Sequence, residues 1–375
     1  MKKIGFFIIS IILLTCRIFA TDASEQLTEE IKDDLSGFTE ALPDDVVNFI
    51  GSGTLSGDFN GLFGGKLMEG DFLNLTLTYL FSGLNAVLRS FASILALLVA
   101  VAIFNSLVDS TVGTVKNIFS LCSSLCVAVA VFGICISLAN NACAYMTVLC
   151  QVTNAFLPVM VTVLTLSGNL SSAVVTNGSM LLFINLVEEF LLKLMLPVVN
   201  VCLAFSSVKS ANHACDLSGI TKIVRTTFTS VTVFVMSVFL FVLSYKGVLS
   251  QSADSLSIKT ARFAISSFVP LVGSSVNDAL RTLSSSMASI KSSCGVIAII
   301  AIAVITLPVI INLFLNKLSF NILSIVSGAI GGQGEKAILD EADSICTFLL
   351  TLCACTSVLF ILGLTVFIKT GAPSI

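Results

Sequence analysis

Long apolar runs separated by short polar linkers dominate this chain from residue 87 onward. A helix of roughly 20 apolar residues crosses the hydrocarbon core of a bilayer, which is about 30 Å thick. Clear runs of this kind cover residues 87–108, 117–139, 144–166, 228–244, 294–315 and 345–368. The pattern predicts an all-α polytopic membrane protein with about six to eight membrane segments, some of them proline-broken or re-entrant.

A further apolar run, residues 173–208, is too long for one straight crossing of the bilayer. As a helix it would extend roughly 50 Å against a core of about 30 Å. Its charged residues are Glu188, Glu189 and Lys193. We therefore expect this segment to break, to tilt steeply, or to turn back near the glutamates.

Residues 258–290 form a charged segment between apolar runs, and it contains Lys259, Arg262, Pro270, Gly273, Asp278 and Arg281. Proline lacks a backbone N–H and disfavours helix at the preceding residue. Backbone without helical hydrogen bonds cannot face lipid. We expect residues 263–273 to pack inside the bundle as a broken or re-entrant segment opposite Pro158, although a loop on the membrane surface would carry the same pattern.

Four of the six prolines fall into two similarly spaced pairs. Pro158 and Pro270 lie in similar apolar tetrapeptides, and Pro197 and Pro308 lie in a second similar pair. Duplicated halves with broken helices are typical of transporters whose pathway lies between the halves. The spacing predicts an internal repeat with halves at about residues 117–225 and 226–369.

The first 86 residues differ from the apolar body. Lys2 and Lys3 followed by an apolar stretch predict a secretory signal over residues 1–20, although an uncleaved anchor and a degenerate lipid-attachment site are alternatives. Residues 21–86 are acidic, and apolar residues recur there every three or four positions, which predicts a small helical extracytoplasmic head. The membrane domain is expected over residues 87–375. The head is either a solvated acidic segment or a docking surface for another extracytoplasmic protein.

Composition narrows the function classes. Hydrophobic residues make up 56% of the chain, charged residues 11%, and mean hydropathy is +1.04, as in an integral membrane protein. With no basic patch, we expect no nucleic-acid partner. The single histidine excludes a two-histidine zinc site, and neither a phosphate-binding loop nor a paired-cysteine motif is present. We therefore predict no catalytic residues, no cofactor and no metal site, and we expect that the protein is not an enzyme.

Ionisable and proline positions within the apolar body are the candidate pathway or structural residues. Glu189 and Lys193 have the i,i+4 spacing of a pair on one helix face, and Asp278 and Arg281 have i,i+3 spacing. Charges at membrane depth are costly and usually face a bundle interior or an aqueous cavity. The alternative is that they lie at the interface and extend their charges to water. The full candidate set is Pro158, Glu188, Glu189, Lys193, Pro197, Lys259, Arg262, Phe268, Pro270, Gly273, Asp278, Arg281 and Pro308.

One stretch also carries a family resemblance. Lys259, the run Ala261-Arg262-Phe263, and Phe268-Val269-Pro270-Leu271-Val272-Gly273 resemble the signature region of the stage III sporulation protein AE family. The similarity extends over nearly the whole chain, including the signal-like start, the acidic head and the order of spans. Members of this family are polytopic membrane proteins of endospore-forming bacteria.

The resemblance implies a membrane component of a trans-envelope channel or secretion-like complex between mother cell and forespore, needed for forespore development. It implies a multi-pass location in the mother-cell membrane around the forespore. The expected partners are the lipid bilayer and other membrane proteins of the same sporulation complex, and oligomerisation is left open. Two alternatives remain from the residues themselves: a secondary transporter with a pathway at proline-broken helices, and a non-conducting membrane scaffold.

Overall fold

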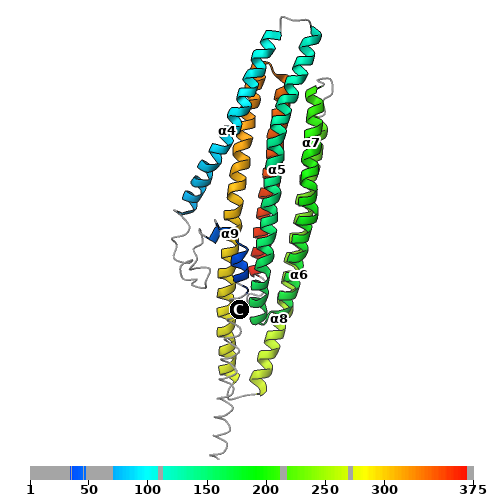
Figure 1. The fold of residues 1–375 in the computed structure, drawn as a ribbon. Helices are drawn as coiled ribbons and strands as arrows, with labels where there is room; N and C mark the ends of the chain where they lie inside the picture. The colour runs from blue at the N-terminus through cyan, green and yellow to red at the C-terminus, as the bar shows by residue number, and fades with distance from the viewer. Residues whose placement is uncertain are drawn as a thin grey trace, which may run out of the picture.

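The computed structural model describes residues 34, 36–44, 46–47, 71–108, 113–211, 218–268 and 273–369. From residue 71 onward it forms an elongated bundle of long helices that lie side by side (Figure 1). The described part of the chain contains no β-strand. The helical elements are α4 (Asp71–Val108), α5 (Gly113–Leu166), α6 (Leu170–Leu186), the π-helix η2 (Val187–Leu192), α7 (Lys193–Ala211), α8 (Ser218–Phe268), α9 (Gly273–Ile330) and α10 (Gln333–Lys369).

Six segments of the described chain are long and apolar enough to cross a membrane. They cover Thr76–Ser106, Leu121–Leu166, Leu170–Lys209, Gly219–Thr260, Ile290–Ile330 and Gln333–Val366. The prediction of an all-helical polytopic membrane protein is confirmed.

The helices are longer and fewer than the apolar runs suggested. The runs at 117–139 and 144–166 belong to one helix, α5, which continues through Asn140 and Asn141. Residues 173–208 do not turn back, because α6, η2 and α7 follow one another without interruption from Leu170 to Ala211. The six-residue π-helix includes both glutamates. It is a local change in helical winding between α6 and α7, and it does not reverse the chain.

Some segments were expected to be broken at prolines, but Pro158, Pro197 and Pro308 each lie inside a continuous helix. A proline removes one helical hydrogen bond but need not end a helix that is held by packing on both sides. Around Pro158, the side chains of Phe156, Leu157 and Val159 are all buried. The described breaks lie elsewhere, at Gly168 and Gly331, which have φ of 79° and 88°. Glycine adopts this left-handed conformation without a steric penalty.

Within residues 263–273 the described side chain is that of Phe263, and it faces outward, contrary to the expected inward packing; for the other residues the expectation stays a prediction. Helix α8 continues regularly to Phe268, and Phe263 on it is 74% exposed. The physical reason is that a regular helix satisfies its own backbone, so this stretch needs no protein around it. Gly273 begins α9. Pro270 lies outside the described residues, so the repeated pair proposed for Pro158 and Pro270 stays a prediction.

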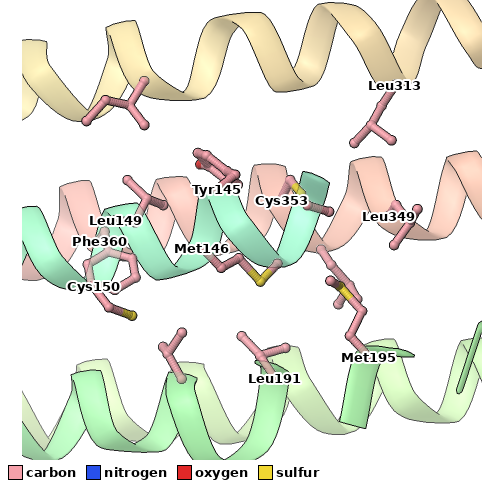
Figure 2. Close-up of a cluster of buried hydrophobic side chains, with 14 of the residues drawn as sticks. Tyr145, Met146, Leu149, Cys150, Leu191, Met195, Leu313, Leu349, Cys353 and Phe360 are labelled. Atoms are coloured by element: carbon pink, nitrogen blue, oxygen red, sulfur yellow. The ribbon is translucent and has the colours of Figure 1, made fainter. Parts of the chain in front are cut away.

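The core lies between α5, α9, α10 and the continuous α6–η2–α7 rod. Figure 2 shows Met146 and Leu149 of α5 with Leu191 of η2 and Met195 of α7 in one apolar cluster. All four side chains are fully buried. On α9 and α10, a Cβ at Gly295 would lie 2.2 Å from Ile368 Cδ1, so the absence of a side chain there permits close approach of the two helices.

The described part of the expected head packs on the bundle. Phe38, Leu42 and Val46 are buried in the same core cluster, and the Phe38 ring lies 5.3 Å from that of Phe156 on α5. Thr162 donates a hydrogen bond of 2.6 Å to Asp34. Helix α4 already begins at Asp71, so the expected boundary between residues 86 and 87 falls within a continuous helix.

Candidate functional site

A buried ion pair joins α8 to α10 at the end of the bundle that contains the α9–α10 turn. Arg225 donates to a carboxylate oxygen of Glu341, and the two side chains are only 12% and 10% exposed. Thr221 donates to the other oxygen of Glu341 at 3.3 Å. Both carboxylate oxygens are therefore occupied, which lowers the cost of removing the charge from water.

A second acid at the same end, Glu335, joins α10 to α5. Its Oε1 accepts hydrogen bonds from the hydroxyl of Ser123 at 2.8 Å and from that of Ser124 at 3.1 Å. The residue is buried, with 3% of its surface exposed. Nearby, Ser324 of α9 donates to Asp340 of α10. Two hollows of about 670 and 530 Å³ share Lys209 and Asp340 in their linings. This end of the bundle is thus a polar, cross-linked cap.

Near the opposite end, Asp254 of α8 caps another helix. Its two carboxylate oxygens accept hydrogen bonds from the backbone N–H groups of Ser171, at 3.0 Å, and Ser172, at 2.8 Å, in the first turn of α6. These are donors that a helix cannot satisfy internally. The sequence supplies only Asn169 at the N-cap position, and its side chain makes no capping hydrogen bond. Asp254 therefore replaces a local cap with one from a distant helix.

Between these ends lie two neutral polar groups. Tyr145 of α5, Thr306 of α9 and Ser357 of α10 form a buried hydroxyl network, in which Tyr145 and Thr306 are 2.9 Å apart. A hollow of about 260 Å³ between α4, α5 and α9 is lined by apolar residues and by five polar ones: Ser90, Ser137, Asn141, Asn312 and Asn316. Asn316 donates to the Asn312 side chain at 2.7 Å. Neither group carries a formal charge.

The predicted Glu189–Lys193 pair forms, but on the outside of the bundle. The two charged groups are bonded to each other, with side chains 68% and 64% exposed. Glu188 is exposed beside them, whereas Val187 and Leu191 of the same π-helix are buried. The alternating exposure places the charges on the surface away from the core.

The other predicted site residues do not gather with this pair into one site in the described structure. Pro197 is exposed on α7, Pro308 is half-buried in α9, and Lys259 is exposed near the end of α8. Arg262, Phe268, Asp278 and Arg281 belong to the described helices, but their side chains are outside the described set, as is Pro270 altogether. The expected pairing of Asp278 with Arg281 stays a prediction.

Sequence reasoning missed the buried acids. Glu335, Glu341 and Asp254 were absent from the candidate set, because each sits in a polar linker or at the end of an apolar run and its partner is more than 80 positions away. The sequence did contain one indication of a buried ion pair, because Arg225 is a cation next to an apolar run in a chain with few charges. Within the described residues, no group of three metal-ligating side chains occurs, and the described cysteines are free thiols.

Comparison with known proteins gives one consistent result. The family model described as stage III sporulation protein AE matches residues 64–371. The stage III sporulation protein AE of Bacillus subtilis (strain 168) is 24% identical over 271 residues, which cover 71% of this chain and 66% of that protein. The chain thus spans slightly less than two thirds of the relative's length. No solved structure matches this chain. Because the family match takes in all six candidate spans, the chain belongs to the stage III sporulation protein AE family.

Proposed function

We propose that this chain is a membrane component of a trans-envelope channel or secretion-like complex between mother cell and forespore, needed for forespore development. The observation that supports this most is the family match over residues 64–371, which contains the complete multi-span bundle. The protein acts from the mother-cell membrane around the forespore, with other membrane proteins of the same complex. It performs no chemical reaction of its own.

A deletion strain tests the role directly. In the bacterium that encodes this chain, deletion of its gene should arrest forespore development after engulfment, and the wild-type gene should restore heat-resistant spores. An Arg225→Met copy should restore fewer spores than the wild-type gene, because it breaks the buried pair with Glu341 and destabilises the fold. Normal spore counts in the deletion strain would end the proposal.

Partner dependence separates the channel complex from the alternatives. The purified chain is reconstituted in liposomes alone and then with the membrane proteins that co-purify with it from sporulating cells. Solute uptake only with the partners supports a channel complex. Uptake by the chain alone indicates a secondary transporter, and co-purification without any uptake indicates a scaffold.

The transporter alternative rested on an internal repeat and on helices broken at prolines. Three of those prolines, Pro158, Pro197 and Pro308, lie inside continuous helices, which weakens the second of these arguments. Among the described helices, the hollow lined by Asn141, Asn312 and Asn316 is one feature that a transport path within one chain could use. At about 260 Å³ it is small compared with ligand pockets, which are usually about 300 Å³ or larger.

A further inference from the structure

The outward face of the α6–η2–α7 rod carries a row of polar residues. We call this row the polar stripe, and it comprises Asn185, Glu188, Glu189, Lys193 and Asn200, all of them exposed. The opposite face of the rod, with Val187, Leu191 and Met195, is fully buried in the core. The stripe is therefore a surface of the single chain.

The π-helix keeps the stripe straight. Asn185, Glu189 and Lys193 follow one another at intervals of four residues, and each interval rotates a regular α-helix by about 40° beyond a full turn. A π-helix winds with more residues per turn, so Val187–Leu192 offsets this drift. Such π segments are rare and occur frequently at functional sites. The backbone thus aligns the charged pair with Asn185.

The two glutamates of the stripe lie at the depth of an apolar, charge-free stretch of α8. The Phe183 ring stacks on Phe239 at 4.9 Å, and the Phe190 ring stacks on Phe228 at 5.6 Å. Glu188 and Glu189 lie between these two contacts. On α8, residues 226–245 contain no charged residue, and 20 residues match a bilayer core of about 30 Å.

Lipid is an unfavourable neighbour for the stripe. At the same depth on α8, Phe234 is 68% exposed, the same fraction as the Glu189 side chain. The phenyl ring suits hydrocarbon, whereas a charged side chain at membrane depth costs several kcal/mol and usually faces protein or a water-filled cavity. The two outward faces therefore require different neighbours.

The stripe is complementary to itself. It contains both charge signs, and the side-chain amides of Asn185 and Asn200 each donate and accept hydrogen bonds. In a two-fold contact the same patch meets on both subunits, so Glu189 of one copy can face Lys193 of the other. We propose that a second copy of this chain covers the polar stripe, stripe against stripe, within the membrane.

Photo-crosslinking in membranes tests this contact without using sporulation as the readout, so it can fail while the proposed function stands. A photoreactive amino acid is placed at Asn185 or, as the matched control, at Phe234, in full-length chains that carry two different tags. We expect crosslinks between the two tags to be about tenfold more abundant from position 185 than from position 234, because in the two-fold contact position 185 faces the other copy. Equal yields, or crosslinks from 185 only to lipid or to another protein, would overturn the proposal.

A charge swap then tests the register. Glu189→Lys places two cations at the contact in every copy and should lower the crosslink yield about tenfold. Co-expression of a Glu189→Lys copy with a Lys193→Glu copy should restore crosslinks between those two copies. Because both residues are exposed in the single chain, each variant is expected to insert and fold normally. A swap that fails to restore the yield, with both copies present at wild-type level, contradicts the stripe-to-stripe register.

Discussion

Two ion pairs in this bundle have the same charge signs and opposite surroundings. Arg225–Glu341 is buried and connects α8 with α10, whereas Glu189–Lys193 is exposed and links neighbouring turns of one rod. Losing the first would remove one contact between two helices and leave a buried charge. Losing the second would leave every helix contact in place. The comparison indicates that the inward charges specify the fold, and that the outward charges are free to serve an interaction.

The largest expected effect comes from removing one member of the buried pair. Arg225→Met should lower the free energy of unfolding by about 3–5 kcal/mol, because Glu341 is left buried without its cation. Unfolding in mixed detergent micelles, followed by circular dichroism, measures this. Arg225→Lys is the control, since it keeps the charge and loses the planar guanidinium. A loss below about 1 kcal/mol would contradict the prediction, because it is the contribution expected of a solvent-exposed ion pair.

A somewhat smaller effect is expected at the second inward acid. Glu335→Ala should cost about 2 kcal/mol, because the hydroxyls of Ser123 and Ser124 lose their acceptor in a buried site. A double-mutant cycle with Ser123→Ala, measured in the same micelles, isolates the coupling between α5 and α10. Additive losses in the cycle would mean that the two helices are not coupled through this acid.

The interhelix cap should contribute less. Asp254→Ala leaves the N–H groups of Ser171 and Ser172 without their acceptor, and loss of a helix cap costs about 1 kcal/mol. Asp254→Asn retains a side-chain oxygen and should recover part of the loss. Amide hydrogen exchange at the start of α6 locates the effect, and unchanged exchange there in Asp254→Ala would refute the capping role.

The outward pair should contribute least to the stability of the single chain. Glu189→Gln should change the free energy of unfolding by less than about 0.5 kcal/mol, the range of exposed i,i+4 pairs. The measurement is made on detergent-solubilised monomer, where a second copy cannot contribute. A loss of several kcal/mol would remove the contrast between the inward and outward charges.

The fold class followed from the sequence because it depends on local properties. Runs of apolar residues decide that helices cross the membrane, and the Glu189–Lys193 spacing decides that the pair meets on one face. Whether that face points into the bundle or away from it depends on how the α6–η2–α7 rod packs, and the residue spacing does not determine this. The positions of Pro158 and Pro197 suggested breaks, but packing against the core held the helices together.

The buried acids could not be located for a related reason. Glu341 and Arg225 are 116 positions apart, and their pairing depends on the order in which α8 and α10 pack. The capping role of Asp254 likewise depends on how α6 packs against α8, 82 positions away in the chain. Contacts between distant segments of this kind need either coordinates or covariation between positions.

The length of α5 has a consequence for how the bundle sits in its bilayer. The apolar segment Leu121–Leu166 has 46 residues and extends about 69 Å, more than twice the hydrocarbon thickness. Tilt alone would have to reach about 60° to absorb this hydrophobic mismatch, beyond the range of about 0–40° seen for membrane helices. Helix α5 packs against α4, α6, α7, α9 and α10, but it also carries exposed apolar side chains such as Leu121, Leu125 and Val129. The apolar surface of the bundle along α5 therefore extends beyond one hydrocarbon thickness, whereas on α8 the charge-free stretch is bounded by Arg225 and Lys246.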